Sequence, residues 1–547
     1  MKALPAVTAT VLLALSVVAG GIPAFAASGS TAAGTAVDSC TVIDEPGRYE
    51  LASNLTSDQD SGGEACLVVA SSDVTLDGNG HTIDATDDDQ TGGVVVVGRA
   101  ETLTNVTVTD LRVTGQTTGV SLRNVADSRV ADVTATHNAN GVWVRDSENV
   151  TVADSVVSRN DGRSADGSGF GVRISGDFEH PTASDGTVVE NTTVVENPYR
   201  GVAIEGSADN VVRDSHIAGN GDWLDDPDQA GGVRITNAPG NELAGNVIEA
   251  NDVHVAAQVT ENAGTVVRGN EFRQATVRVG NDDAQTTATG TAVTGNAFAG
   301  GGVELRSPAR DTTVAGNAFR DGGTVRVTDA NRTTVRNNTV VDAPVAIAVR
   351  SATGATVDGN AVRNATDVGI EVTNVANASV TGNLVAESQV GVAVHSWRSN
   401  LDGYRRVTGN LVVNGTTGID VGSPLAPVTV RANEVRANEY GVVVDEPGQC
   451  VAGPEGAELV AIHGNDFVGN GLGVDNRDPE TVNATGNYWG SSDGPSSTDD
   501  EDAPFADPET GEPADGSGDA VSEGVTAGVS NVHFDAWASN ETVIVDA

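Results

Sequence analysis

The sequence has almost no lysine, methionine or cysteine and few aromatic residues. Lys2 is the only lysine, Met1 is the only methionine, and aromatic residues make up 3% of the 547 residues. So small an aromatic share excludes a large conventional core built from bulky side chains. A hydrophobic share of 38% nevertheless excludes wholesale disorder. The chain must therefore bury many small apolar side chains in a thin and regular architecture.

Basic residues are scarce compared with acidic ones. The 30 Lys and Arg residues stand against 76 Asp and Glu residues, which gives a formal net charge of −46. This charge argues against a nucleic-acid partner, because phosphate contacts need clustered Lys and Arg. Carboxylates in such numbers are typical of proteins exported into very salty surroundings, where salt screens their repulsion. We therefore expect an acidic, halophilic protein.

Apolar runs of transmembrane length are missing after the N-terminus. Residues 1–27 resemble a secretory signal peptide, with Lys2, an apolar stretch over Val11–Val18 and a small-x-small cleavage site over Ala24–Ala26. No second apolar span of about 20 residues follows, so no membrane span is expected after signal removal. These features predict a secreted protein, either extracellular or on the cell surface. We expect it to be a monomer.

Cysteine is limited to three residues. In an exported protein, Cys40 and Cys66 are expected to form a disulfide that staples the N-terminal region. Cys450 is then left over. The spacing of the three cysteines matches no zinc-binding pattern, so a cysteine-based metal site is not expected.

A repeat of about 22 residues takes the place of a conventional domain pattern. The motif apolar-x-(Gly/Asp)-(Asn/Ser)-x-apolar occurs at Val108–Val113 and returns, for example, at Val293–Phe298. Gly-apolar-x-apolar motifs, as at Gly119 and Gly141, lie between its copies. The Val- and Thr-rich alternation predicts short strands, and Gly and Asn supply turns with positive φ. The third position of the motif, called the anchor, falls at 110, 132, 154, 191, 214, 245, 269, 295, 316, 337, 359, 382, 409, 432, 464 and 486.

One repeat is long enough for three short strands and three turns, which make one coil of a parallel β-helix. Coils stacked at the strand spacing of about 4.8 Å bury small side chains on each inner face. We therefore predict an all-β solenoid of about sixteen coils over residues 94–490, one for each anchor. Residues 28–93 are expected to form an N-terminal cap, and residues 491–547 an acidic irregular tail with a C-terminal cap. A β-propeller or β-sandwich array is the alternative, but its units are longer and richer in Trp and Tyr.

The repeat also predicts where individual side chains lie. The third residue after each anchor, such as Phe298, is expected to point into the core. Function is expected where the repeat is interrupted, since repeated residues in a solenoid are mostly structural. Four Asn residues that each lie six positions after an anchor are expected to stack as an amide ladder: Asn138, Asn160, Asn197 and Asn220.

The repeated Gly-Asn-x-Val and Gly-Val motifs resemble those of NosD-type right-handed parallel β-helix proteins. Val74–Ile83 (VTLDGNGHTI) is similar to the opening coil of that family, and Asn487–Gly490 (NYWG) is similar to its closing coil. The resemblance covers roughly residues 70–495 and implies a right-handed solenoid. The family is described as periplasmic copper-binding proteins and is grouped with carbohydrate-binding and sugar-hydrolase β-helices. The resemblance is specific for the fold but not for the function, because β-helices host many activities.

Two long insertions, 161–169 and 221–230, leave the same corner of the solenoid with only the coil anchored at Asn191 between them. Their aromatic, basic and acidic residues are what a sugar-binding cleft needs, because rings stack on pyranose faces and charged groups bind hydroxyls. The alternative is that both are solvated acidic loops. The expected ligand-binding residues are Arg163, Tyr199, Arg200, Asp222 and Trp223.

Catalysis in the same groove, by a polysaccharide lyase or a glycoside hydrolase, is the alternative function. A glycosidase needs two carboxylates in a fixed geometry. A lyase needs calcium ligands and a base, which would have to be Arg because no Lys remains in the mature chain. The spacing does not require either geometry, so the sequence favours binding over catalysis. The candidate catalytic residues are Asp166, Asp225, Asp226 and Arg200.

Metal binding is the third possibility. Calcium suits the acidic insertion, which supplies closely spaced carboxylate oxygens. Copper, which the resemblance implies together with a role in metalloenzyme assembly, suits the sequence poorly. The mature chain has no Met, and its eight His residues form no paired motif. The candidate calcium ligands are Asp222, Asp225, Asp226 and Asp228.

A shorter insertion near residue 400 carries the most basic cluster of the chain and is a second place for an anionic sugar or a partner. Its residues are His395, Trp397, Arg398, Tyr404, Arg405 and Arg406. Taken together, these features predict a binding or structural β-helix protein whose partner is a polysaccharide or a surface glycan.

Overall fold

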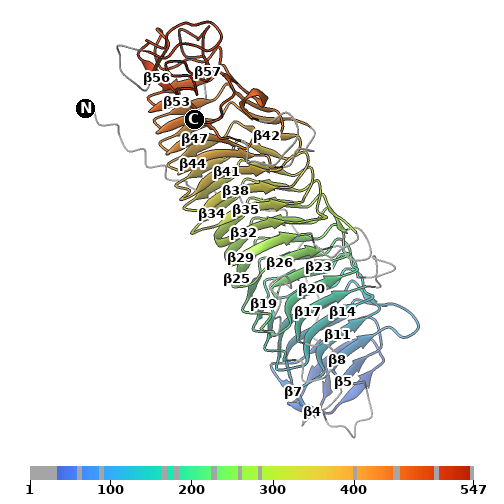
Figure 1. Cartoon of the computed structure of the whole chain (residues 1–547). Coiled ribbons are helices and arrows are strands. Elements are labelled where there is room, and N and C mark those ends of the chain that lie inside the picture. Colours follow the sequence, from blue (N-terminus) through green and yellow to red (C-terminus); the bar gives the residue numbers. More distant parts are fainter. Residues whose placement is uncertain are drawn as a thin grey trace.

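The chain folds into one elongated β-solenoid of about 17 turns, seen here in a computed structural model (Figure 1). The coils succeed one another in sequence order, from the blue N-terminal end to the red C-terminal end. The predicted all-β solenoid of about sixteen coils is therefore confirmed. The structure describes residues 34–57, 64–85, 92–161, 169–176, 184–222, 231–256, 262–280, 286–397, 403–446, 456–497 and 504–542.

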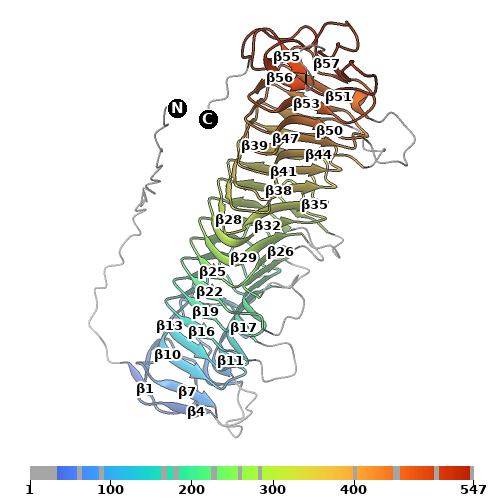
Figure 2. The same cartoon turned by 60° about the vertical axis from the view of Figure 1, so that its left-hand side comes forward.

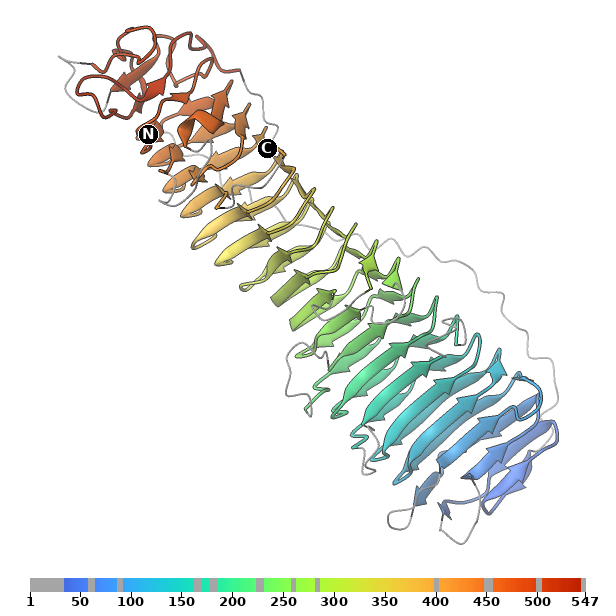
Figure 3. The same ribbon diagram turned by 45° about the vertical axis from the view of Figure 1, so that its right-hand side comes forward.

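Three parallel sheets run along the solenoid, and successive coils add successive strands to each (Figure 2, Figure 3). The first sheet contains β1 (Thr35–Val37), β3 (Gly47–Leu51), β6 (Val74–Asp77), β10 (Thr107–Thr114), β13 (Arg129–Thr136), β15 (Thr151–Ala153), β18 (Val188–Glu190), β21 (Val211–Arg213), β24 (Glu242–Ala244), β28 (Val266–Arg268), β31 (Ala292–Thr294), β33 (Thr313–Ala315), β36 (Thr334–Arg336), β39 (Thr356–Asp358), β42 (Ala378–Thr381), β45 (Arg405–Thr408), β48 (Val428–Arg431), β51 (Val460–His463), β54 (Val482–Asn483) and β57 (Val532–His533).

The second sheet shares β10 and β13 with the first, because these strands continue through the corner. Its other strands are β4 (Leu55–Ser57), β7 (Thr82–Ala85), β16 (Val156–Ser158), β19 (Thr193–Val195), β22 (His216–Ala218), β25 (Val247–Glu249), β29 (Glu271–Val279), β32 (Ala297–Leu305), β34 (Ala318–Arg320), β37 (Thr339–Val341), β40 (Ala361–Arg363), β43 (Leu384–Ala386), β46 (Leu411–Val413), β49 (Glu434–Arg436) and β52 (Asp466–Val468).

The third sheet shares β29 and β32 with the second and carries the candidate site. Its other strands are β2 (Thr41–Ile43), β5 (Ala65–Val69), β8 (Gly92–Val97), β11 (Thr118–Arg123), β14 (Asn140–Arg145), β17 (Phe170–Ser175), β20 (Arg200–Glu205), β23 (Val233–Thr236), β26 (Val253–Ala256), β35 (Thr324–Thr328), β38 (Val345–Arg350), β41 (Val368–Thr373), β44 (Val390–His395), β47 (Thr417–Gly422), β50 (Tyr440–Val444), β53 (Leu472–Asn476), β55 (Pro495–Ser497) and β56 (Gly518–Val521).

Short pieces of other structure complete the described part of the chain. Two parallel strand pairs lie outside the three sheets, β9 (Leu103–Thr104) with β12 (Val125–Ala126) and β27 (Asn262–Ala263) with β30 (Ala288–Thr289). The 3-10 helix η2 (Ala457–Leu459) is a single turn. No helix in the described segments is both long enough and apolar enough to cross a membrane.

The anchors form the corner between the first and second sheets. All sixteen have a positive φ, from 48° at Asn191 to 72° at Gly486. This conformation is strained for most residues and is adopted most easily by Gly, Asn and Asp, which explains the composition of the motif. Ala432, with a φ of 51°, is the one anchor that is not Gly, Asn or Asp. The corner therefore repeats because one backbone conformation repeats.

Amide ladders join the coils at two corners. The predicted ladder is confirmed: Asn138 Nδ2 donates to Asn160 Oδ1 at 3.1 Å, and Asn197 Nδ2 donates to Asn220 Oδ1 at 2.9 Å. A second and longer ladder follows the anchors directly and was not predicted. Each member donates both Nδ2 and backbone N to the Oδ1 of the next coil, except the last, Asn487, which only accepts within the ladder. The members are Asn246, Asn270, Asn296, Asn317, Asn338, Asn360, Asn383, Asn410, Asn433, Asn465 and Asn487.

The core is a column of small apolar side chains with one aromatic stack. Phe272, Phe298 and Phe319, each the third residue after an anchor, are at most 1% exposed, which confirms the inward position predicted for them. Their ring centroids are 4.6 and 4.7 Å apart and the rings are nearly parallel. Identical positions in successive coils lie directly above one another, so the parallel register itself produces the stack.

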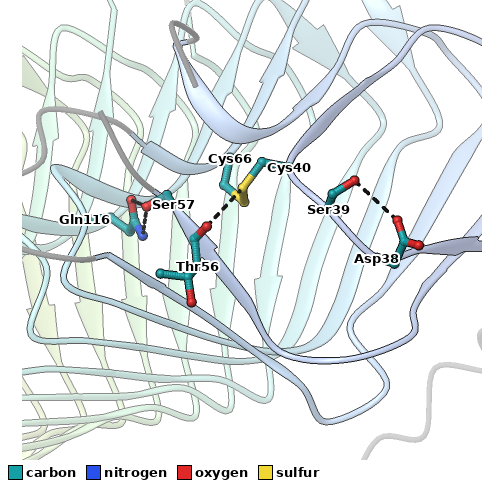
Figure 4. Close-up of a disulfide and its surroundings, with 7 residues drawn as sticks. All are labelled: Asp38, Ser39, Cys40, Thr56, Ser57, Cys66 and Gln116. Atoms are coloured by element: carbon teal, nitrogen blue, oxygen red, sulfur yellow. Dashed lines mark hydrogen bonds between the residues drawn. A yellow bond between two sulfur atoms is a disulfide. The ribbon is translucent and has the colours of Figure 1, made fainter. Parts of the chain in front are cut away.

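The N-terminal end contains the predicted disulfide, which joins Cys40 and Cys66 (Figure 4). It lies beside β2 and β5, whose residues pair in parallel. Nearby, Ser57 Oγ and the amide of Gln116 are hydrogen-bonded at 3.0 Å inside the coil. The strands β1–β8 pair in parallel with the coils that follow, and at the other end β57 pairs with β54. The cap boundaries proposed from the sequence remain predictions.

Candidate functional site

The two long insertions flank one coil of the third sheet. The first returns at Gly169, whose carbonyl accepts hydrogen bonds from the backbone N of Tyr199 at 3.1 Å and of Arg200 at 3.3 Å. The second returns at Gly231, whose carbonyl accepts from Gly201 N at 2.7 Å. The coil that carries Tyr199 and Arg200 therefore lies directly between the ends of both insertions.

Most of the residues proposed within these insertions lie outside the described residues, so their roles as ligand-binding, catalytic or calcium-binding groups stay predictions. Three described residues, Tyr199, Arg200 and Asp222, can be placed. Asp222 is exposed where the second insertion begins, Tyr199 is partly exposed and Arg200 is buried. The residues outside the described segments are Arg163, Asp166, Trp223, Asp225, Asp226 and Asp228.

An aromatic–arginine cluster covers the outer face of β14, β17 and β20. We use this name for Trp143, Phe170, Arg173, Tyr199 and Arg200. The guanidinium carbon of Arg173 lies 5.0 Å from the centroid of the Trp143 ring and 4.7 Å from that of Phe170. Phe170 meets Tyr199 edge to face at 4.8 Å, and the guanidinium of Arg200 lies 4.1 Å from the Tyr199 ring. The five side chains thus form one continuous stack of rings and cations.

The charges of the cluster are only partly compensated. Glu205 accepts a hydrogen bond from Arg173 at 2.8 Å, but it lies 3.9 Å from Arg200. Arg200 is 4% exposed, and its Nε has no acceptor among the described residues. Burial and the positive charge of Arg234 lower the pKa of Arg200 below its ordinary value. A buried guanidinium with so little compensation favours an anionic or strongly polar ligand beside it.

Trp143, Phe170 and Arg173 were missed from the sequence, although a signal was present. Side chains alternate along a strand, so a residue between two inward apolar residues must face outward. This is the position of Trp143 in Gly141–Val144 and of Arg173 in Gly171–Ile174. β14 and β17 pair in register, with Trp143 opposite Arg173. Comparison of the outward positions of consecutive coils would have brought these residues together.

The second predicted cluster, near residue 400, is less basic than its sequence suggests. Arg398 lies outside the described residues, and Arg405 is only 1% exposed. Trp397 is 58% exposed and Tyr404 is 40% exposed, and Arg406 stacks on Tyr404 at 4.1 Å. The exposed part of this cluster is therefore mainly aromatic.

Beside this cluster His395 faces carboxylates. His395 Nε2 lies 3.0 Å from Asp420 Oδ2, and the His395 ring is 5.9 Å from that of Trp397. Burial opposes protonation, but the hydrogen bond and charge of Asp420, with the charges of Glu371 and Asp445, raise the pKa of His395 above its ordinary value. Burial, together with Asp420, likewise raises the pKa of Asp445. These groups form a titratable patch on the outer face of β41–β50.

The side-chain donors of the described residues do not fit a copper centre. Cys40 and Cys66 are joined to each other, so neither supplies a thiolate. No group of three or more His, Cys, Asp and Glu side chains that would hold a metal ion occurs in the described part of the chain. We therefore assign no copper chemistry to these residues.

Three solved structures resemble this chain at low identity. The tailspike protein of E. coli bacteriophage HK620, in complex with a pentasaccharide, is 11% identical with a TM-score of 0.36 over 84% of this chain and 72% of the tailspike. ORF18 of Geobacillus virus E2 is 15% identical with a TM-score of 0.38 over 50% of this chain and 53% of ORF18. Alginate lyase from Paenibacillus sp. str. FPU-7 is 17% identical with a TM-score of 0.30 over 50% of this chain and 89% of the lyase. The chain thus spans about half the length of ORF18, and similarity at this level says nothing about function.

Comparison with protein families gives a clearer result than comparison with single proteins. No curated protein sequence matches the chain. The family described as "Periplasmic copper-binding protein (NosD)" matches residues 61–264, 183–302, 257–402 and 309–499, which together cover most of the chain. The matched region includes the opening motif at Val74–Ile83 and the closing motif at Asn487–Gly490. The chain therefore belongs to the NosD family.

Proposed function

We propose that this NosD-family protein is an exported glycan-binding protein and that it binds a polysaccharide on the outer face of β14, β17, β20 and β23. The observation that carries the proposal is the aromatic–arginine cluster. Its rings and guanidinium groups lie on adjacent strands of a rigid sheet, so their positions are set before a ligand arrives. A preformed site of this kind loses little conformational entropy on binding.

The chemistry of the cluster suits a sugar. Partly exposed rings offer apolar surface to the C–H face of a pyranose, and guanidinium groups donate several hydrogen bonds to hydroxyl or carboxylate oxygens. Arg173 and Trp143 are both partly exposed, and the guanidinium carbon of Arg173 lies 5.0 Å from the centroid of the Trp143 ring. The ends of the two insertions, at Gly169 and Gly231, lie beside the same strands.

Binding is favoured over catalysis by the carboxylates of this face. Glycoside hydrolysis needs two carboxyl groups that flank the scissile bond. Among the described residues of β14, β17, β20 and β23, Glu205 is the one outward carboxylate, and it is hydrogen-bonded to Arg173. A lyase or hydrolase activity would therefore depend on Asp166, Asp225 or Asp226, which remain candidates from the sequence alone.

Export is part of the proposal and is supported by two features. Residues 1–27 resemble a secretory signal, and a disulfide joins Cys40 and Cys66. Disulfides persist in oxidising compartments and are rare in reducing ones. A periplasmic, extracellular or cell-surface location agrees with both features and with the description of the family.

The test is affinity electrophoresis of the full mature chain in gels that contain neutral or acidic polysaccharides. We expect Trp143→Ala to weaken binding about fivefold or more, because stacking of a ring on a sugar is worth about 1 kcal/mol or more. Tyr440→Ala, which removes a partly exposed ring on β50 outside both candidate clusters, is the matched control and should bind like the parent protein. Thermal unfolding of both variants shows whether either change acts through stability.

The outcomes separate the alternatives. Unchanged binding by a folded Trp143→Ala variant, or an equal loss in Tyr440→Ala, would overturn the assignment of the site. Size-exclusion chromatography of each polysaccharide after incubation, with and without Ca²⁺, tests for depolymerisation. Shortening of any polymer would replace the binding proposal with an enzymatic one, and mutagenesis would then begin at Asp166, Asp225 and Asp226.

A further inference from the structure

We infer that the ligand of the third sheet is an acidic polysaccharide, such as a uronic acid polymer, lying lengthwise along a strip of arginines. This inference rests on the proposed function and adds the chemical class and the direction of the glycan. It follows from the charge on the outer face of the third sheet. That face is locally positive, whereas the protein as a whole is negative.

The arginine strip consists of the outward arginines on, or directly after, the strands from β11 to β38. Glu205 and Glu304 are the carboxylates on the same outward positions of these strands among the described residues, and Asp146, Asp252 and Asp329 lie at the strand ends, so the arginines still outnumber the carboxylates. A chain with a net charge of −46 thus presents one locally positive face. The members of the strip are Arg123, Arg145, Arg173, Arg200, Arg234, Arg278, Arg306, Arg326 and Arg350.

The charge of the face changes sign beyond the strip. From β41 to β53, the outward positions carry Glu371, Asp420, Asp445 and Asp475, with Arg477 as the one arginine among the described residues there. An anionic polymer is therefore attracted to the N-terminal two thirds of the sheet and repelled from its C-terminal part. The positive segment defines where the polymer lies.

Three members of the strip have no carboxylate partner among the described residues. Arg123 and Arg326 are exposed, and Arg234 donates only to the hydroxyl of Thr236, at 3.0 Å. Arg234 is also close enough to Arg200 to lower the pKa of that buried side chain. A carboxylate of the ligand beside this pair would relieve the repulsion and compensate the buried charge, and such charge-assisted hydrogen bonds are strong.

Several arginines on the first sheet are paired with carboxylates. Arg213 pairs with Glu190 at 2.5 Å, Arg129 lies 3.7 Å from the same carboxylate, and Arg268 pairs with Glu242. These ion pairs link neighbouring coils and satisfy the guanidinium groups within the protein. Arg336 and Arg431 of the first sheet are exposed and have no carboxylate partner among the described residues, so what distinguishes the third sheet is the combination of unpaired arginines with the aromatic–arginine cluster on one face.

A hollow of about 270 Å³ interrupts the strip on β29, β32 and β35. The backbone of Gly301 and Gly302 lines it, and Arg278, Glu304 and Arg326 form its charged lining. Thr276 and Thr324 add hydroxyl groups at its edge. An acidic sugar placed in this hollow would have its carboxylate beside Arg326, so we assign the hollow as a second binding subsite for the polymer.

The geometry fits a polymer with widely spaced charges. β23, β26, β29, β32 and β35 are successive strands, so Arg234 and Arg326 are four strand spacings, or about 19 Å, apart. One strand spacing is close to the length of one sugar in an extended polysaccharide. Nucleic acids carry charges much more densely, at about 1.7 Å per charge in a duplex, and would be repelled more strongly by the acidic remainder of the protein.

The test compares three probes with the mature protein across a salt series: polygalacturonate as the acidic glycan, dextran as the neutral glycan and single-stranded DNA as another polyanion. We expect polygalacturonate to bind at least tenfold more tightly than dextran and to weaken as salt rises. The double variant Arg234→Gln/Arg326→Gln should lose at least tenfold in affinity for polygalacturonate and show a shallower salt dependence. Arg363→Gln removes an exposed arginine of β40 on the second sheet, so it makes a matched charge change and should have no effect.

Each result has a separate meaning. Equal binding of dextran and polygalacturonate, sensitive to Trp143→Ala, would overturn the acidic class and leave the proposed glycan binding intact. No binding of any glycan would overturn the proposed function itself. Tighter binding of DNA, or an effect of Arg363→Gln as large as that of the double variant, would show that the strip selects charge alone and would also overturn the inference.

Discussion

The ring of His395 occupies the space directly outside Gly422. A Cβ on Gly422 would lie 2.6 Å from His395 Cδ2 and 2.9 Å from Nε2, far closer than atoms pack. The two residues pair across β44 and β47, and the missing side chain lets the imidazole reach Asp420 Oδ2 at 3.0 Å. The His395–Asp420 hydrogen bond therefore requires a residue as small as glycine at position 422.

Gly422→Ala should consequently act through His395. The backbone of Gly422 lies outside the left-handed region, so alanine adds steric contact without backbone strain. We expect the imidazole to be displaced from Asp420 and the free energy of unfolding to fall by about 1–2 kcal/mol at pH 6. Denaturant unfolding of Gly422→Ala, His395→Gln and the double variant measures this. Fully additive effects of the two changes would contradict the predicted coupling.

Stability should depend on pH through His395. Although burial opposes protonation, Asp420, Glu371 and Asp445 raise the pKa of His395 in the folded protein. The imidazole therefore holds its proton more tightly in the folded protein than in the unfolded chain. The stabilisation is complete below the unfolded pKa of about 6.5 and is lost as pH rises through the higher folded pKa. We expect the free energy of unfolding to fall by about 1–2 kcal/mol across this window.

The measurement is the denaturation midpoint of the parent protein and of His395→Gln at pH values from 6 to 9. The variant lacks the titrating group and should show a flatter profile over this range. Asp420→Asn keeps the size of the side chain but removes the charge, and should flatten the profile as well. Parallel profiles for all three proteins would exclude His395 as the source of the dependence.

The unpredicted amide ladder should be a major source of stability. Asn383 Oδ1 accepts from the backbone N and from Nδ2 of Asn360, and Asn383 Nδ2 donates to Asn410 Oδ1 and to the carbonyl of Val357. Asn383→Ala leaves buried donors and an acceptor without partners, so we expect a loss of about 3 kcal/mol. Chemical denaturation measures the loss. The exposed Arg363→Ala should change stability by less than about 0.5 kcal/mol, and an equal effect of both changes would refute the role of the ladder.

The phenylalanine stack should be similarly sensitive. Phe298 is 1% exposed and packs between Phe272 and Phe319. Phe298→Ala removes a ring from both contacts and leaves a cavity, so we expect a loss of about 3–5 kcal/mol. Phe298→Leu keeps most of the buried volume and should lose less, about 1–2 kcal/mol. Denaturation midpoints that fall equally for the two variants would show that ring volume is not the cause.

The fold could be read from the sequence because a solenoid is built from local repetition. A positive φ at the anchors favours Gly, Asn or Asp, and alternation along short strands decides which side chains point inward. Asn138 and Phe298 could therefore be assigned to a ladder and to the core by counting from an anchor. The longer ladder through Asn383 was in the motif as well, but its hydrogen bonds join coils 21 to 32 residues apart and are visible only when coils are superimposed.

The candidate site was only partly accessible from the sequence. Tyr199 and Arg200 were found because they lie between two breaks in the repeat, where the irregularity is local. Trp143 and Arg173 were missed because they lie 30 residues apart, on either side of an insertion and outside it. Their contact depends on the register between coils, and the intervening insertion changes the sequence distance without changing that register.

By itself the sequence determined the repeat, the acidic charge, the inward and outward positions and the disulfide between Cys40 and Cys66. Only the tertiary structure decided which outward residues share a face, that Arg173 lies between Trp143 and Phe170, and that Arg200 is buried beside Arg234. The reason is physical. Periodicity fixes the direction of a side chain from its own strand, whereas stacking, burial and charge compensation depend on neighbours supplied by other coils.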